Sequence, residues 1–191
     1  MDWNENSLTP YENAQLDVWR TQMQIPPRFV HANIPEKERD MFIEGQSIYL
    51  FGRPGNGKTH RICGYLHKRA IEKVKDKQYH PDALFVSYPN LLRLLRESYG
   101  ANGNAHTLEA YINIPYLILD DFGGVKETEW VNEMTFVLID QRYQKCLPTI
   151  ITSNVTIDDL EKTYGARVRN RIAVMCDSIE VESQQKMKFV G

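Results

Sequence analysis

Residues 50–60 read Leu50-Phe51-Gly52-Arg53-Pro54-Gly55-Asn56-Gly57-Lys58-Thr59-His60, which fits the pattern G-x-x-x-x-G-K-[ST]. Gly55 and Gly57 allow backbone N–H groups to converge closely on the negative charges of a polyphosphate. Lys58 adds a positive charge for the β- and γ-phosphates, and the Thr59 hydroxyl can bind Mg²⁺. The stretch therefore predicts a nucleotide-binding loop, whose expected contact residues are Gly52, Pro54, Gly55, Asn56, Gly57, Lys58, Thr59 and His60.

The sequence on both sides of this loop agrees with the prediction. Residues 47–51 have the composition of a buried strand. After the loop, apolar residues recur at helical spacing, at Ile62, Leu66, Ala70 and Val74. A helix that begins at the loop directs its N-terminus at the phosphates, where it stabilises negative charge. The alternative, a chance glycine turn, would not need this strand and helix.

Length and composition limit the class of protein. A chain of 191 residues with 42% hydrophobic and 25% charged residues is long enough for one domain with a full core. Its net charge of −2 does not indicate a nucleic-acid binder, so any such contact must come from a local patch. The three cysteines are far apart and support neither a zinc site nor a disulfide framework. We find no signal peptide and no apolar run that could span a bilayer, and we therefore expect a cytoplasmic location.

Two adjacent carboxylates end a second apolar run. Residues 116–121 read Tyr-Leu-Ile-Leu-Asp-Asp, which predicts a strand buried on both faces with acids at its carboxyl end. Open α/β sheets bind their ligands at that edge. We expect Asp120 to hold the Mg²⁺ shell and Asp121 to orient or deprotonate the attacking water. The alternative is a pair of aspartates that only cap a helix.

The remaining patterns predict an α/β fold. Further strands are expected at residues 84–88, 148–154 and 178–181. Helices are expected to begin near a proline or a capping residue, at Pro89, Thr107, Thr128 and Thr156. Gly100 and Gly165 are expected to end the first and the last of these helices. Because strands alternate with helices, the sheet should be parallel and covered on both faces.

Three polar residues near the carboxyl end have two interpretations each. Asn154 ends a predicted strand, where it can contact the γ-phosphate or the water, or can serve only as a turn residue. Arg167 and Arg171 are four residues apart and share a helix face. A solvated basic face is the usual explanation for such a pair.

Residues 1–27 resemble an appendage to the main domain. Thr9-Pro10-Tyr11-Glu12 is a capping box with proline at the first helical position. The following residues Leu16, Trp19 and Met23 fall on one face of a short amphipathic helix. This face can pack back on the domain or bind a partner, and the sequence does not separate the two.

Several motifs, taken in order, resemble the DnaC-type and IstB-type AAA+ ATPases. Residues 24–29 resemble the short motif that opens their core, and residues 57–60 resemble their phosphate loop. Residues 119–123 resemble their Walker B, and residues 148–154 resemble their sensor 1 strand. The segment 164–171 resembles the one that carries their arginine finger. The resemblance covers about residues 24–182.

The resemblance implies an AAA+ P-loop NTPase domain over residues 28–191, with a five-stranded parallel sheet and little or no C-terminal lid domain. It implies Mg²⁺-dependent ATP hydrolysis by an assembly that holds ATP at subunit boundaries. Arg171 then takes the role of the finger that acts on a neighbour's ATP, Arg167 supports it, and Asn154 takes the sensor 1 role. The family's sensor 2 arginine has only a loose counterpart in Lys186, so slow or partner-dependent hydrolysis is expected.

Among the branches of this family, the resemblance favours a loader of the replicative DNA helicase, in a minimal phage or mobile-element form. Loaders of this type contact single-stranded DNA, and the matching positions are Arg93, Arg96, Tyr99, Thr128 and Trp130. Both aromatic residues can equally belong to the core. An IstB-type transposition ATPase and an adaptor that uses ATP only as a switch remain open. A small-molecule kinase is a further alternative, although no insertion for its arginine-bearing lid is visible.

Overall fold

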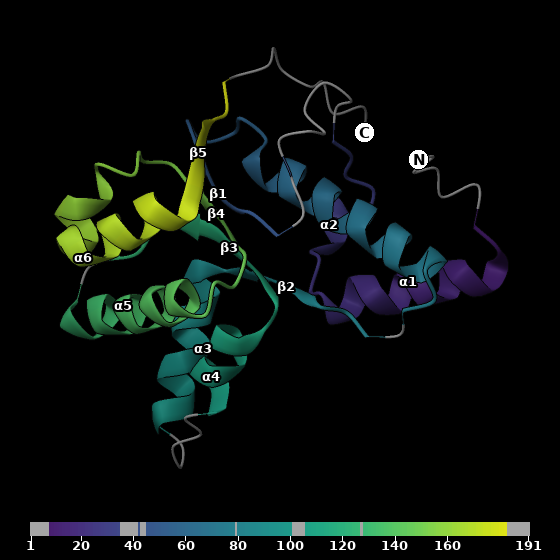
Figure 1. Cartoon of the computed structure of the whole chain (residues 1–191), viewed down its shortest axis with the longest axis horizontal. Helices are drawn as coiled ribbons and strands as arrows, with labels where there is room; N and C mark the ends of the chain where they lie inside the picture. The colour runs from purple at the N-terminus through teal and green to yellow at the C-terminus, as the bar shows by residue number, and fades with distance from the viewer. Residues whose placement is uncertain are drawn as a thin grey trace.

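Five parallel strands form one sheet in the computed structural model, in the order β2-β3-β4-β1-β5 (Figure 1). The strands are β1 (Ser47–Phe51), β2 (Ala83–Ser87), β3 (Tyr116–Phe122), β4 (Thr149–Ser153) and β5 (Cys176–Glu180). The structure describes residues 8–34, 42, 45–78, 80–100, 106–126 and 128–182, without the side chains of residues 99, 100, 106 and 107. The five-stranded parallel sheet predicted from the sequence is thereby confirmed.

The helices are α1 (Pro10–Gln22), the short 3-10 helix η2 (Pro27–Phe29), α2 (Lys58–Lys75), α3 (Tyr88–Gly100), α4 (His106–Asn113), α5 (Glu129–Gln144) and α6 (Leu160–Met175). They lie on both sides of the sheet, α1 and α2 on one and α3 to α6 on the other (Figure 1). Strand alternation explains the two layers. Ile48 and Leu50 of β1 face α1 and α2, whereas Tyr49 between them faces the opposite layer.

Helix α1 is part of the core. Its capping box is present, since the Glu12 N–H donates to Thr9 Oγ1 (3.3 Å) and the Thr9 N–H donates to Glu12 Oε2 (2.7 Å). The apolar face carries Leu16, Trp19 and Met23, whose side chains are 0%, 1% and 0% exposed. The structure agrees with the first of the two interpretations of this face, because the face packs on the domain. A division of the chain at residue 27 stays a prediction.

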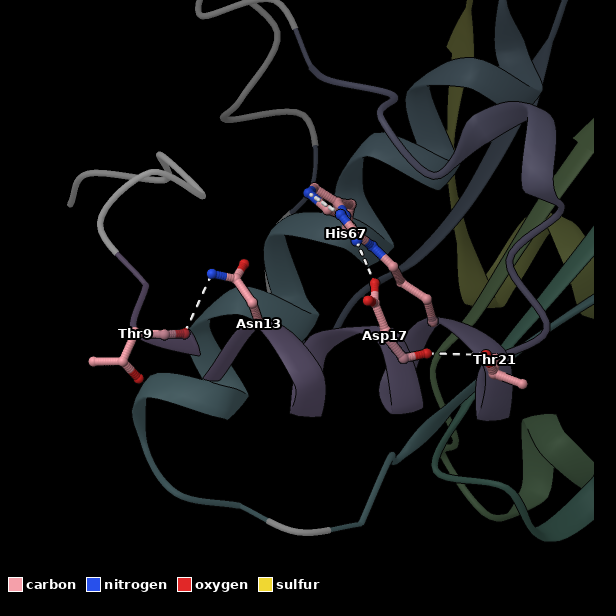
Figure 2. Close-up of polar contacts among 6 residues, drawn as sticks. Thr9, Asn13, Asp17, Thr21 and His67 are labelled. Carbon is pink, nitrogen blue, oxygen red and sulfur yellow. Dashed lines mark hydrogen bonds and ion pairs between the residues drawn. The ribbon is translucent and has the colours of Figure 1, made fainter. Parts of the chain in front are cut away.

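Polar contacts also attach α1 to its neighbours. Figure 2 shows Thr9, Asn13, Asp17 and Thr21 along α1 and His67 on α2. Arg20 donates to Asp17 (2.8 Å) and contacts the His67 ring (3.2–3.3 Å), which ties α1 to α2. Just after the helix, Met23 O accepts a hydrogen bond from the Phe85 N–H (2.8 Å) in the edge strand β2. The N-terminal segment therefore touches both α2 and the sheet.

Arg142 of α5 is a charged residue with no solvent exposure. Its Nη1 donates to the carbonyls at the end of α4, those of Tyr111, Ile112 and Ile114 (2.8–3.0 Å). Its Nε donates to Thr149 Oγ1 (2.8 Å), and Nη2 donates to Pro148 O (2.6 Å). Burial lowers the pKa of this guanidinium to about 10. These bonds satisfy carbonyls that a helix end leaves unpaired, and they join α4 and α5 to the start of β4.

Element boundaries differ from the prediction in a few places. Strand β2 covers residues 83–87, so the predicted strand residue Tyr88 is the first residue of α3. Thr156 does not cap α6: it caps the short turn at residues 157–159, and the helix begins at Leu160. Gly165 has a non-helical φ of 78° and ψ of 165°, so one helix ends there, as predicted, and a second helix follows within the range given for α6. Strand β5 begins at Cys176, two residues before the predicted strand.

Candidate nucleotide-binding and hydrolysis site

The phosphate loop joins β1 to the N-terminus of α2. Gly55 and Gly57 have φ values of 83° and 81°, in the left-handed region that favours glycine. Gly57 is the residue before α2, and no side chain caps the first turn of that helix. The backbone N–H groups of this turn are thus available to an anion, and the loop fits the polyphosphate of a nucleotide.

Lys58 lies at the centre of this loop. Its side chain is largely buried, and Nζ donates to Gly52 O (2.8 Å), Arg53 O (3.1 Å) and Asn154 Oδ1 (2.8 Å). Burial lowers the pKa of Lys58, while the nearby carboxylates of Asp120 and Asp121 oppose that change. The ammonium group is therefore placed between the loop, β4 and the two acids.

Contacts outside the loop fix its shape. Asn56 Nδ2 donates to Val181 O (2.7 Å), and Arg61 Nη1 donates to Asn56 O (2.7 Å). Gly52 lies so close to the same backbone that an added Cβ would be 2.5 Å from Val181 O. His60 lies edge-on to Phe29, with ring centroids 6.3 Å apart, and burial together with Arg61 lowers the pKa of its imidazole. Of the predicted loop residues, Pro54 and Gly55 are exposed at the turn.

Thr59 and Asp120 meet at the carboxyl end of β3. Thr59 Oγ1 donates to Asp120 Oδ1 (2.9 Å), and Thr152 Oγ1 of β4 donates to the same oxygen (2.6 Å). Burial raises the pKa of Asp120, and the two hydroxyl bonds partly offset this. One hydroxyl and one carboxylate at this distance are oxygen ligands of the kind that Mg²⁺ takes, usually together with waters and phosphates. The pair fits a magnesium ion beside the phosphate loop.

Asp121 lies where strand β3 is irregular. The register between β3 and β4 shifts between Leu119 and Phe122, which is a β-bulge, and Asp121 has a φ of 58°. Its N–H donates to Thr152 Oγ1 (3.0 Å), and its exposed carboxylate accepts from Asn154 Nδ2 (3.4 Å). The second acid is therefore exposed to solvent, next to Asn154.

A cavity of about 360 Å³ opens beside these groups. Thr59 and Asp120 line one part of it, and η2, β2 and the start of α3 line the rest through Phe29, Ser87 and Asn90. Space for ligand atoms and water therefore adjoins the candidate metal position.

The two predicted finger arginines lie on α6 and contact α5. Arg171 Nε donates to Asp140 Oδ1 (2.7 Å), and the Arg171 guanidinium carbon lies 4.7 Å from the centre of the Tyr143 ring. The guanidinium carbon of Arg167 lies 3.7 Å from the centre of the Phe136 ring. Both contacts are with the neighbouring helix of the same chain, and an action on a neighbour's ATP stays a prediction.

The sequence profile of the family described as IstB-like ATP binding protein matches residues 21–185. The chain belongs to this family. The match includes the phosphate loop, the acids of β3, Asn154 and both α6 arginines. Within the described residues, no helix of this IstB-like chain is long and apolar enough to cross a membrane.

Two curated relatives of this IstB-like chain are named as replicative helicase loaders. It is 28% identical over 160 residues to the replicative helicase loader DnaI of Bacillus subtilis, covering 75% of this chain and 48% of DnaI. It is 22% identical over 131 residues to the replicative helicase loader DnaC of Escherichia coli, covering 66% of this chain and 49% of DnaC. The chain thus spans about half the length of the curated relatives it matches.

Solved structures show the same fold. A crystal structure of the DnaC helicase loader is 26% identical, with a TM-score of 0.62, and the match covers 91% of this chain and all of that one. DnaA from Aquifex aeolicus, bound to AMPPCP, is 20% identical with a TM-score of 0.64 over 86% of this chain and 53% of DnaA. The IstB-like chain therefore has the AAA+ P-loop NTPase fold.

The predicted DNA-contacting residues have contacts within the chain. Arg96 lies over the Trp130 ring, with its guanidinium carbon 5.0 Å from the centroid, and Trp130 is half-buried. Arg93 donates to Glu97 (2.6 Å) and to Asn90 (2.9 Å), and Thr128 caps α5 by accepting from the Val131 N–H (3.2 Å). The side chain of Tyr99 and residue Lys186 lie outside the described parts of the IstB-like chain.

Some residues of the site were not predicted from the sequence. Thr152 contacts both the Asp120 carboxylate and the Asp121 N–H. Thr152 lies two residues before Asn154 in the predicted strand 148–154, and this was a usable signal because alternate residues of a strand share a face. Asp140 and Tyr143 hold Arg171 from α5, and no signal within the α6 sequence could have indicated them.

Proposed function

We propose that this chain is an ATP-hydrolysing loader of a replicative DNA helicase that also contacts single-stranded DNA. The observation that carries the hydrolysis is the grouping of Lys58, Thr59, Asp120, Asp121 and Asn154 at the carboxyl ends of three adjacent strands. The names of DnaI and DnaC support the choice of a loader.

Each residue of the group has a distinct task in this proposal. Lys58 exchanges its carbonyl partners for oxygens of the β- and γ-phosphates of ATP, and the N–H groups of the loop and of the first turn of α2 bind the remaining oxygens. Thr59 and Asp120 hold Mg²⁺, which when bound neutralises charge on the phosphates. Asp121 orients the attacking water or accepts its proton, and Asn154 positions that water against the γ-phosphate.

The Arg171 side chain completes the site from a neighbouring copy of the chain. Its guanidinium stabilises charge on the γ-phosphate of ATP bound by the adjacent subunit, an effect worth about 10³–10⁵ in rate for arginine fingers. Hydrolysis should therefore depend on self-assembly, and the rate per chain should rise with protein concentration. Arg167 supports the finger in this arrangement.

Single-stranded DNA is proposed to bind near the start of α5 and the outer side of α3. The Arg96–Trp130 pair offers a cation and an aromatic face on which a base can stack, worth about 1–3 kcal/mol per base. In fluorescence anisotropy with a labelled oligonucleotide, Trp130→Ala should weaken binding about 5-fold or more. An unchanged affinity would show that the ring serves only as packing.

Substitution of Lys58 tests the nucleotide site. Lys58→Ala should abolish ATP binding in calorimetry, because it removes the cation that lies between the loop and the acids. ATP binding at the parent affinity would contradict the whole assignment of the site. Lys68→Ala on the same helix is the control, because Lys68 lies two and a half turns beyond the loop.

A pull-down with the host's replicative helicase, with and without ATP, tests the loader assignment. Capture of the helicase that depends on ATP supports it. The alternative, a transposition ATPase of the IstB type, would instead capture a transposase and prefer duplex DNA. An adaptor that only uses ATP as a switch would capture the helicase and show no turnover.

A further inference from the structure

Helix α5 presents a row of three side chains to the arginines of α6. Phe136, Asp140 and Tyr143 are spaced by four and three residues, which places them on one face of α5. Arg167 and Arg171 are spaced by four residues on α6. Phe136 lies under Arg167, while Asp140 and Tyr143 both contact Arg171. Each of the two α6 arginines therefore packs on at least one of the three α5 side chains.

The contacts of Arg171 leave one end of its guanidinium open. Nε is the atom that donates to Asp140, and the Tyr143 ring lies against the guanidinium group. Nη1 and Nη2 make no hydrogen bond within the described residues, and the side chain is 41% exposed. These two terminal nitrogens are the ones that bind two oxygens of a phosphate at once.

Asp140 is itself held in place. Its side chain is 12% exposed, and Gln144 Nε2 donates to the carboxylate oxygen that Arg171 does not use. Asp140 therefore presents one fixed oxygen to Nε. An arginine that is held at Nε by a carboxylate and lies against an aromatic ring loses rotational freedom, while its phosphate-binding end stays free.

We propose that Asp140, with Tyr143, is a positioning residue that orients Arg171 for ATP held by a second copy of this chain. This inference rests on the proposed function, in which Arg171 acts across a subunit boundary. Asp140 does not touch the nucleotide, and it acts only through the orientation of the arginine.

Loss of Asp140 should lower turnover without affecting ATP binding. Asp140→Ala should reduce the kcat of ATP hydrolysis about 10- to 100-fold, the effect expected when a catalytic group is displaced by about 1 Å. The affinity for ATP should stay at the parent value, because the chain's own phosphate loop is untouched. Asp140→Asn keeps an oxygen that accepts from Nε and should lose less. In an Arg171→Ala background, Asp140→Ala should cause no further loss.

The matched control is Asp158→Ala. Asp158 is also paired with an α6 arginine, Arg169, but that pair does not involve Arg171. Turnover by Asp158→Ala should equal that of the parent. A loss as large as that of Asp140→Ala would overturn the inference, because any ion pair on α6 would then have the same effect. Urea unfolding of each variant separates a loss of turnover from a loss of folding.

A mixing experiment shows on which side of the boundary Asp140 acts. Asp121→Asn retains ATP binding and an intact Arg171, so it can supply a finger to an Asp140→Ala neighbour. Mixing inactive Asp121→Asn with slow Asp140→Ala should raise the rate of hydrolysis above that of Asp140→Ala alone, whereas mixing Asp140→Ala with Arg171→Ala should not. An absence of this rise in the first mixture would overturn the inference, because Asp140 would then act on its own chain's ATP.

Two further outcomes separate the inference from the proposed function. If Arg171→Ala is inactive but Asp140→Ala turns over ATP as fast as the parent, or faster, the positioning role is wrong and the finger stands. If Arg171→Ala is fully active at every protein concentration, the finger itself is wrong, and the role of Asp140 is wrong with it.

Discussion

Replacing Trp19 with alanine should remove about 3–4 kcal/mol of folding free energy. The side chain is 1% exposed, and a buried tryptophan removes about 200 Å² from water, worth about 5 kcal/mol at about 25 cal/mol/Å². Its indole Nε1 is buried without a hydrogen-bond partner among the described residues, and this costs about 1–2 kcal/mol. The net loss of about 3–4 kcal/mol, which is the gain from burial minus this cost, is within the range measured for large-to-small substitutions in cores.

Urea unfolding followed by far-UV circular dichroism measures this change without a tryptophan signal. With a slope of about 1–3 kcal/mol per molar urea, the midpoint of Trp19→Ala should fall by about 1 M or more. Val18→Ala is the matched control, because Val18 is the next residue on α1 but is 46% exposed. Its free energy of unfolding should stay within about 0.5 kcal/mol of the parent.

A Trp19→Ala midpoint equal to the parent's would refute the conclusion that α1 belongs to the core. The same reasoning applies to deletion of residues 1–23, which removes Leu16 and Met23 as well. Loss of three buried side chains at about 2–5 kcal/mol each approaches the total stability of a typical domain, about 5–15 kcal/mol. The shortened chain should therefore not fold, and a folded, ATP-binding product would show that the segment is a detachable hook.

Four other predictions concern the site and the core. Asp121→Asn should bind ATP and Mg²⁺ almost as the parent does and stop turnover, whereas Asp120→Asn should lose Mg²⁺ affinity; equal metal loss in calorimetry would contradict the two roles. Burial raises the pKa of Asp120, so the ionised carboxylate destabilises the folded chain without Mg²⁺ at pH 7. Asp120→Asn should therefore have a higher free energy of unfolding in urea than the parent at pH 7. This difference should disappear below about pH 4, where the aspartate is protonated in the unfolded chain as well. Arg142→Met should cost about 3–5 kcal/mol in the same assay because it leaves buried carbonyls without a donor; a cost below about 1 kcal/mol would show that water replaces it. Gly52→Ala should lower the melting temperature, since its Cβ would lie 2.5 Å from Val181 O, and an unchanged value would mean that the loop shifts freely.

The part of the site that could be predicted from the sequence is the part encoded by local pattern. Spacing defined the phosphate loop, and the apolar run before Asp120 defined β3 and its carboxyl end. The left-handed backbone of Asp121 and the register shift between β3 and β4 could not be predicted, because they depend on how β3 pairs with a distant strand. Pairing between distant segments leaves no trace in either segment alone.

Tertiary packing decided the features that the sequence left open or misplaced. The apolar face of α1 had two possible partners, and only the position of α2 beside it shows which one it has. Arginine is a residue type that usually lies on the surface. Arg142 is nevertheless buried, and five hydrogen-bond acceptors from other segments surround it.

The hydrogen bond from the Phe85 N–H to Met23 O has a consequence for solubility. Strand β2 is an edge of the sheet, and Phe85 is its middle residue. Exposed edge strands pair with strands of other molecules and cause aggregation. Here the chain's own N-terminal segment occupies the middle of that edge, so copies of the chain cannot extend the sheet there. Truncation at the N-terminus should consequently produce β-rich aggregates rather than a merely loosened monomer.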